Sequence, residues 1–285
     1  MADLLKTLII PNNTTMEENN IVVNGDVLVG NYAEIGYGMI AKSIIVGEKV
    51  SIAGCLNASD DVRLDFWSNV KGNVSTKKDA YLGESVKING KLIVYGDLDI
   101  GNDVSVDEGF EAKGWIVIRN PVSVIVYIVL YLTELFRLGK SEEVEKFLNE
   151  LYEEEQVTDH TLIIPNRAKI TYDTIQVPNN VIIGDDSRLV GSIRSSSVRL
   201  GKNTTLFGGI RVRDSIYIDE GSTIHGNLVS RGGIYVEKSA HILGKIEGGF
   251  IKVHEDAIVD GAMKAENGVR ILKEESEQEG WGEEK

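Results

Sequence analysis

Residues 241–271 read HILGKIEGGFIKVHEDAIVDGAMKAENGVRI, and the same pattern extends back along the chain to Val181. An apolar side chain stands two residues before and two residues after each glycine of the pattern, and a second apolar pair follows seven to ten residues later. The glycines recur at a nearly constant interval, at Gly191, Gly208, Gly226, Gly244 and Gly261. A fixed period of about 18 with internal alternation is typical of a β-solenoid, in which each repeat forms one coil.

The recurring apolar residues are predicted to point into the coil, because they alternate with polar residues as a half-buried strand requires. In one repeat these inward residues are Ile242, Ile246, Ile251 and Val253. The repeated glycine is expected where a tight coil has little room for a side chain. Polar corners rich in Gly, Asn and Asp follow each second apolar pair and supply the turns.

The chain carries this unit twice. TLIIPN occurs at residues 7–12 and again at residues 161–166, and each copy precedes a polar segment and a run of coils. The glycines of the first unit keep the same interval, at Gly54, Gly72 and Gly90. The sequence therefore predicts an all-β protein with two β-helix domains, residues 1–120 and 157–272. Each TLIIPN is expected to begin a leading strand or cap.

Between the two units the period breaks, and residues 121–156 are predicted to form an α-helical hairpin. One face of its second helix is apolar at helical spacing, with Val144, Phe147, Leu148 and Leu151 as candidate contact residues. This hairpin could cap a β-helix, pack between subunits or touch a membrane. Its longest uncharged run, residues 120–133, is shorter than the roughly 17–25 residues that a spanning helix needs. Residues 273–285 are acidic and are expected to form a disordered tail.

Composition limits the partners and the compartment. The chain has 285 residues and a net charge of −14, which argues against nucleic acid or an anionic membrane surface as the main partner. One cysteine, Cys55, suits a reducing compartment. The first residues lack the basic region and cleavage site of a signal peptide. A cytoplasmic protein is therefore expected.

Motifs for catalysis, cofactors or metals are weak. Gly36 to Ala41 fits the dinucleotide fingerprint on paper, but a strand rather than a helix is predicted to follow. Cys55 occupies an outward position and has no predicted partner. The histidines fall at different phases of the repeat, namely His160, His225, His241 and His254. We therefore predict no catalytic residue, no cofactor and no metal, although a metal site formed across subunits stays open.

The glycine ladder, best seen in residues 241–271, resembles the bactofilins, a family of polymer-forming cytoskeletal proteins. The resemblance covers both β-helical units but neither the hairpin nor the tail. It implies a right-handed, roughly triangular β-helix that assembles without nucleotide. It also implies a scaffold role in cell shape or in placing other proteins near the inner face of the membrane. Two β-helices in one chain depart from the single β-helix typical of that family, so the chain could close on itself instead of forming filaments.

A terminal coil exposes an apolar plate and a row of unpaired backbone groups, which favour stacking on another copy. We therefore expect a non-enzymatic scaffold whose main partner is itself, as an oligomer or a filament. The candidate self-association residues are Ile21, Val22 and Val23 at one end and Val269 and Ile271 at the other. Two alternatives stay open: a hexapeptide-repeat acyltransferase or zinc-dependent, carbonic-anhydrase-like enzyme, and a membrane-associated scaffold.

Overall fold

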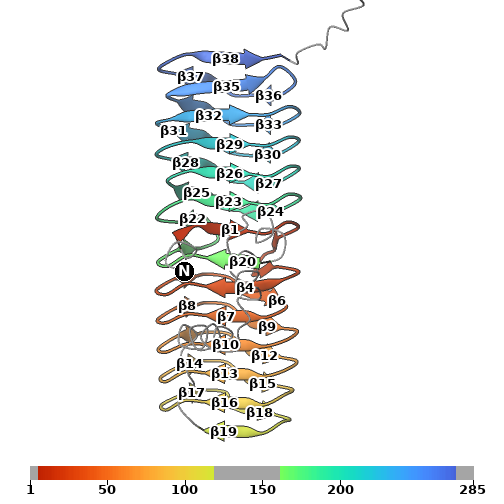
Figure 1. The fold of residues 1–285 in the computed structure, drawn as a ribbon, viewed down its shortest axis with the longest axis vertical. Helices are drawn as coiled ribbons and strands as arrows, with labels where there is room; N and C mark the ends of the chain where they lie inside the picture. Colours follow the sequence, from red (N-terminus) through yellow and green to blue (C-terminus); the bar gives the residue numbers. More distant parts are fainter. Residues whose placement is uncertain (1–5, 119–160, 274–285) are drawn as a thin grey trace, which may run out of the picture.

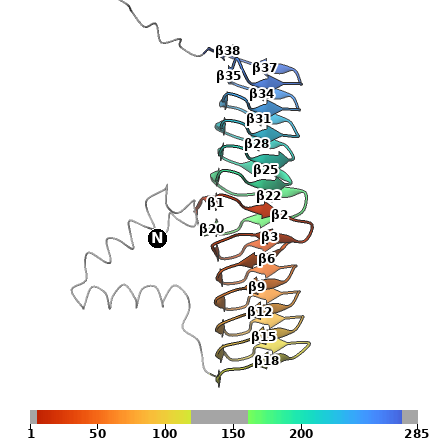
Figure 2. The same ribbon diagram turned by 90° about the vertical axis from the view of Figure 1, so that its right-hand side faces the viewer.

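The computed structural model describes residues 6–118 and 161–273, which form one rod of stacked β-coils (Figure 1). The rod is a β-solenoid of about 12 turns with about 18 residues per coil. No α-helix occurs within these two ranges. Strands of successive coils join into three long sheets along the sides of the rod (Figure 2). The predicted all-β solenoid is thus confirmed.

Each coil contributes short strands to the three sheets, so neighbours within a sheet come from adjacent coils. Sheet A has 14 strands, in the order β19 (Ile116–Ile118), β16 (Leu98–Ile100), β13 (Ala80–Leu82), β10 (Val62–Leu64), β7 (Ile44–Val46), β4 (Asp26–Val29), β20 (Thr161–Ile164), β1 (Leu8–Ile10), β23 (Val181–Ile183), β26 (Val198–Leu200), β29 (Ile216–Ile218), β32 (Gly233–Val236), β35 (Phe250–His254) and β38 (Val269–Leu272). Sheet B has 12 strands, in the order β18 (Phe110–Ala112), β15 (Leu92–Val94), β12 (Val74–Thr76), β9 (Leu56–Ala58), β6 (Gly38–Ala41), β3 (Asn20–Val22), β2 (Thr15–Met16), β24 (Arg188–Val190), β27 (Thr205–Phe207), β30 (Thr223–Ile224), β33 (His241–Ile242) and β36 (Ile258–Val259). Sheet C has 12 strands, in the order β17 (Ser105–Val106), β14 (Lys87–Ile88), β11 (Asn69–Val70), β8 (Ser51–Ile52), β5 (Glu34–Ile35), β21 (Lys169–Ile170), β22 (Thr174–Gln176), β25 (Ser192–Ser195), β28 (Ile210–Val212), β31 (Leu228–Ser230), β34 (Ile246–Gly248) and β37 (Met263–Ala265).

The register places like residues above one another, which explains the strict period. Val62 pairs with Ile44 on one side and with Ala80 on the other, so inward aliphatics of successive coils are in contact. The predicted inward residues of the interior coils are buried, including Ile242, Ile246 and Ile251, each at 0% exposure. Each coil is too thin to bury this surface alone, so the stack is the unit of stability.

The repeated glycines are required by the close approach of one coil to the next. A methyl group on Gly244 would lie 2.3 Å from the backbone oxygen of Gly226, and one on Gly261 would lie 2.3 Å from that of Gly244. Both sites are corners between sheets B and C. Distances this short exclude any side chain, which confirms the predicted reason for the glycine.

Polar side chains link the corners of successive coils. Asp79 Oδ1 accepts a hydrogen bond from the backbone N–H of Asp97 at 2.7 Å, and Asp97 Oδ1 accepts one from Trp115 at 2.7 Å. Asn and Asp also occupy left-handed corner positions, for example Asn203 at φ 52° and Asp186 at φ 53°. These residue types tolerate that conformation because their side chains can hydrogen-bond locally.

The two units meet at their N-terminal ends and exchange their leading strands. β1 pairs in parallel with β23 of the second unit, whereas β20 pairs in parallel with β4 of the first. β1 and β20 then pair with each other, antiparallel, with Ile9 opposite Ile163. Each TLIIPN segment therefore forms a leading strand, as predicted, but it covers the first coil of the other unit.

In each of the other two sheets one strand crosses to the other unit, since β2 pairs with β24 and β21 pairs with β5. The antiparallel pairs β2–β3 and β21–β22 lie at this junction. All other strand pairs in the described residues are parallel. The two units therefore run in opposite directions from a shared centre, and all three sheets pass through it. The predicted units are thus parts of one continuous stack.

Side-chain contacts strengthen the junction. The rings of Tyr37 and Tyr172 lie 4.6 Å apart, and Lys169 Nζ lies 2.7 Å from Glu34 Oε2. Burial, and secondarily the neighbouring Tyr172 and Asp173, raise the pKa of Tyr37 above its ordinary value. Tyr37 is 1% exposed. Both contacts join segments that are distant in the sequence, so the junction is a tertiary contact rather than a linker.

The predicted helical hairpin, residues 121–156, lies outside the described residues, as do its candidate contacts Val144, Phe147, Leu148 and Leu151. The predicted tail is described only at Lys273. Within residues 6–118 and 161–273, we find no helical segment with the length and apolar character needed to cross a membrane.

Candidate functional site

The two ends of the rod are the candidate site for self-association. Each end is the last coil of one unit and carries the terminal strand of all three sheets. At the end of the second unit these strands are β36, β37 and β38, and at the end of the first unit they are β17, β18 and β19. Each terminal strand has one edge without a neighbouring strand among the described residues, and such an edge is a template for further pairing.

At the end of the second unit, the inward aliphatics face no further described coil. Val269 is 43% exposed and Ile271 is 60% exposed, whereas their counterparts one coil below, Ile251 and Val253, are 0% and 4% exposed. Ile258 and Met263 of the same coil are also exposed. The structure thus places Val269 and Ile271 in an apolar end plate, where the repeat pattern puts them.

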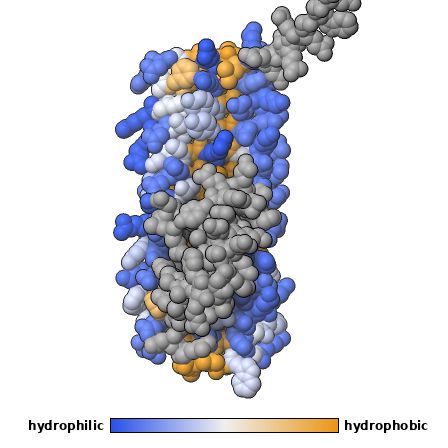
Figure 3. All heavy atoms as spheres, in the orientation of Figure 1, coloured by the Kyte–Doolittle hydropathy of each residue, from blue (hydrophilic) through white to orange (hydrophobic). Residues whose placement is uncertain are grey.

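The end of the first unit matches this arrangement and was not among the sequence candidates. Ile116 is 47% exposed and Ile118 is 77% exposed on β19, and Phe110 and Trp115 are exposed beside them. Orange spheres appear at both extremities of the rod in Figure 3. The signal was available, because Ile116 and Ile118 form the last apolar pair of the first unit.

The other predicted plate is wrong. Ile21 and Val23 are buried at 1% and 4% exposure, and Val22 is half-buried. β3, which contains Ile21 and Val22, lies between β2 and β6 in sheet B. The exchanged leading strands cover this coil, so these three residues lie at the centre of the rod and offer no free end.

The histidines do not converge. His225 stacks on Phe207 with ring centroids 4.5 Å apart, His241 Nε2 lies 2.9 Å from Asp260 Oδ2, and the nearly buried His254 accepts a hydrogen bond from the backbone N–H of Asp256. His160 lies outside the described ranges. Among the residues that the structure describes, no cluster of three or more His, Cys, Asp or Glu residues could hold a metal ion.

Cys55 has a structural contact. Its Sγ accepts a hydrogen bond from the backbone N–H of Asn73 at 3.3 Å. One coil further on, Asn73 Oδ1 accepts the equivalent bond from Lys91 at 2.9 Å. The thiol is half-buried rather than freely exposed. It therefore takes the place of a corner asparagine in the stack.

A glycine of the dinucleotide-like motif, Gly38, also allows neighbouring coils to pack closely. Gly38 begins strand β6, and a methyl group there would lie 2.3 Å from Asn20 Oδ1 and 2.6 Å from the backbone oxygen of Cys55. The prediction that a strand follows this motif is confirmed.

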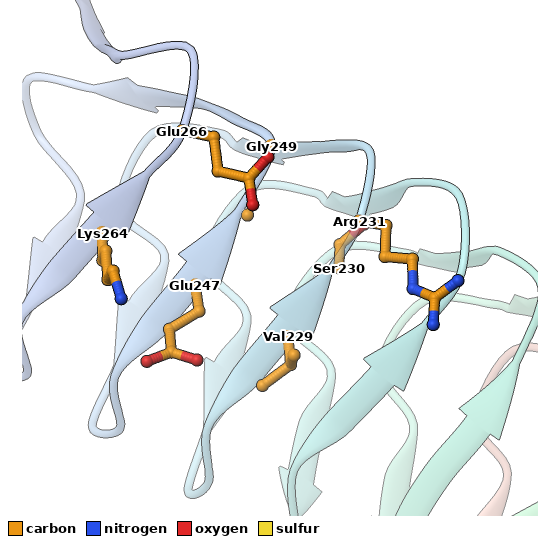
Figure 4. A pocket seen from close by; sticks show the side chains of 8 residues that line it. Val229, Ser230, Arg231, Glu247, Gly249, Lys264 and Glu266 are labelled. Carbon is orange, nitrogen blue, oxygen red and sulfur yellow. The ribbon is translucent and has the colours of Figure 1, made fainter.

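Shallow depressions occur on the side of the second unit. One of about 390 Å³ is lined by Val229, Arg231, Glu247, Lys264 and Glu266 along sheet C (Figure 4). A second of about 390 Å³ adjoins it and shares Arg231. A third of about 140 Å³ lies over Tyr217 and Tyr235 of sheet A, whose rings stack 4.7 Å apart.

No family model matches the chain, and no solved structure matches it.

Proposed function

We propose that the protein is a non-enzymatic structural scaffold that self-associates through the two ends of its rod. The observation that carries the proposal is the exposure of an inward aliphatic pair at each end, Ile116/Ile118 and Val269/Ile271. Burying such side chains contributes about 1.5–3 kcal/mol each. Stacking would also pair the free edges of three sheets at once.

Assembly of this kind needs no nucleotide, as the resemblance to the bactofilins implies. The N-terminal faces of both units are already joined inside the rod, so any end-to-end contact between rods joins one last coil to another. Strands that meet at such a contact run antiparallel, as β1 and β20 do at the junction. A filament of rods built this way would have no overall polarity. A cytoplasmic location, near the inner face of the membrane, belongs to the same proposal and is supported by the single cysteine.

The test is to replace Val269 and Ile271 with Lys and to measure assembly by sedimentation velocity and negative-stain electron microscopy. We expect wild-type rods to lengthen with concentration and the variant to lose contacts at that end. The matched control, Ile40→Lys with Leu243→Lys, places the same charges on exposed positions along the sides. A wild type that stays a single rod at high concentration, or equal assembly of both variants, would overturn the proposal.

The helical hairpin predicted for residues 121–156 is part of the proposal, as a contact of sheet A. The chain leaves the described region at Ile118 on β19 and returns at Thr161 on β20, both in sheet A. Six rungs separate these strands, a span of about 29 Å at about 4.8 Å per rung. We propose that the hairpin's apolar residues run along this sheet.

The outward side of sheet A offers them a surface. It carries an aliphatic stripe in continuous register, consisting of Ile45, Leu28, Ile163, Ile9 and Ile182.

Replacing Leu28 and Ile182 with Lys should speed proteolysis within residues 121–156, since the stripe would no longer accept apolar side chains. Tyr217→Lys on the same sheet, away from the stripe, is the control. Equal cleavage of the two variants would contradict a hairpin contact here.

We also infer a right-handed winding of the coils, as the resemblance implies. Connections between parallel strands of one sheet are right-handed in nearly all proteins. The enzymatic alternative, a hexapeptide-type acyltransferase or zinc enzyme, predicts bound zinc or loss of activity in His225→Ala. Elemental analysis of the purified protein distinguishes it from the scaffold.

A further inference from the structure

The second unit carries an arginine groove on sheet C, defined here by the side chains of Arg194, Arg211, Arg213 and Arg231. They line one depression of about 390 Å³ together with Gln176, Val177 and Pro178. Arg194 on β25 and Arg211 on β28 are direct partners in register. Arg213 and Arg231 follow β28 and β31 at one corner, a coil apart. The four side chains therefore form a staggered array of two pairs over three successive coils.

This groove is unusual in so acidic a protein. The chain has 44 acidic and 30 basic residues, yet no carboxylate lines the groove. Within the described ranges, none of the four arginines forms an ion pair with Asp or Glu, whereas Lys78, Lys169 and Lys202 each do. The acidic side chains of the described residues therefore form no ion pairs with these four arginines.

Local hydrogen bonds position the Arg213 side chain without neutralising its charge. Arg213 Nη2 donates to Ser196 Oγ at 2.5 Å and to the backbone oxygen of Pro178 at 3.3 Å, and both acceptors are neutral. Arg231 also lines the adjoining depression, which contains Glu247 and Glu266. In Figure 4 the guanidinium of Arg231 extends away from both.

The spacing of the array suggests what it binds. Adjacent rungs lie about 4.8 Å apart, and like charges directly opposite one another destabilise a sheet unless something lies between them. A guanidinium group binds phosphate through two parallel N–H···O bonds and is weakly hydrated. Two neighbouring rungs therefore match two linked phosphate groups better than they match one isolated anion.

We propose that the arginine groove binds a ligand with linked or adjacent phosphate groups. The ligand is either a soluble phosphorylated compound or the headgroup of a phosphorylated lipid. The groove lies on the side of the rod, away from both ends, so binding there does not depend on end-to-end association. The site can therefore recruit a ligand whether or not the rods assemble.

The test uses full-length protein and inorganic pyrophosphate, with binding followed by isothermal titration calorimetry at low and moderate salt. Wild-type protein should bind, and Arg194→Gln with Arg211→Gln should weaken binding at least about tenfold, as expected for the loss of strong bidentate bonds. The control, Arg199→Gln with Lys252→Gln, removes two positive charges from the outward side of sheet A and should bind as the wild type does.

Thermal unfolding gives an independent readout. Without ligand, the groove variant should have a Tm equal to or above that of the wild type, because it relieves repulsion between rungs. Pyrophosphate should raise the Tm of the wild type and the control but not that of the groove variant. This comparison also shows that the variant is folded.

Flotation with vesicles of phosphatidylcholine, with and without phosphatidic acid, separates the two sources. Groove-dependent flotation with phosphatidic acid identifies a lipid headgroup, and pyrophosphate binding without flotation identifies a soluble ligand. Absence of pyrophosphate binding by the wild type at millimolar concentration, or equal loss of binding in the groove and control variants, would overturn the proposal.

Discussion

The junction and the ends of the rod are built from the same coil but differ in what covers it. At the junction, β1 and β20 each lie between two other strands of sheet A, so that Ile10 and Ile164 are 1% and 0% exposed. At the ends, the corresponding aliphatics Ile118 and Ile271 are 77% and 60% exposed. The repeat itself therefore does not determine whether the face of a coil is covered. The leading strands determine it, because they cover the faces at the junction and leave the faces at the ends free.

The largest expected effect is a charge buried at the junction. Ile164→Lys should lower the free energy of unfolding by more than about 4 kcal/mol, because an unpaired ammonium group would lie in the core. Ile271→Lys at the end should change it by less than about 0.5 kcal/mol, since the site is exposed. Urea unfolding followed by circular dichroism measures both. Similar losses for the two variants would mean that the end is covered in solution.

A smaller effect is expected where coils stack through glycine. A methyl group on Gly54 would lie 2.1 Å from the backbone nitrogen of Gly38, next to the junction. Gly54→Ala should therefore cost about 1–3 kcal/mol of stability. Gly268 at the end has φ +97° and nothing within 4 Å of an added methyl, so Gly268→Ala should cost only the backbone strain, about 1 kcal/mol. Thermal unfolding of both variants checks the order, and a reversed order would contradict the packing account.

The smallest effect is a pH dependence to which the junction contributes through Tyr37. Because burial raises the pKa of Tyr37 in the folded state, the unfolded chain loses this proton first as the pH rises. The stability from Tyr37 is fully present below the unfolded pKa of about 10, and it is lost as the pH rises through the folded-state pKa.

Tyr37→Phe should therefore lose less stability than the wild type between about pH 9 and pH 11 in urea unfolding. Tyr81→Phe is a useful second variant, since burial also raises the pKa of Tyr81 although it lies in sheet A of the first unit, away from the junction. An unchanged alkaline loss in Tyr37→Phe would show that this hydroxyl does not contribute.

The repeat could be predicted from sequence because its causes are local. An inward residue such as Ile246, or a stacking glycine such as Gly244, is determined by the coils directly before and after its own, so the pattern is visible along the chain. The exchange of leading strands could not be predicted in this way. β1 covers the same kind of aliphatic surface on either unit, and the choice depends on a pairing between Leu8 and Val181.

The same reasoning explains the other misses. Ile21 and Val23 look terminal in sequence because no coil precedes them, yet β2 covers them by folding back as an antiparallel hairpin. The arginine groove was not predicted, because the residues at outward positions vary freely from coil to coil. Its signal was the recurrence of arginine at outward positions 194, 211 and 231 in an acidic chain.

The exchanged strands set an order for synthesis. β1 is the first described strand to leave the ribosome, but its partner β23 is made only after the whole first unit, and β4 must wait for β20 in the same way. The first unit can wind its coils during translation while its starting face stays open. A second nascent chain nearby could fill that face with its own TLIIPN, so crowded polysomes would be the setting in which two polypeptides become interlocked.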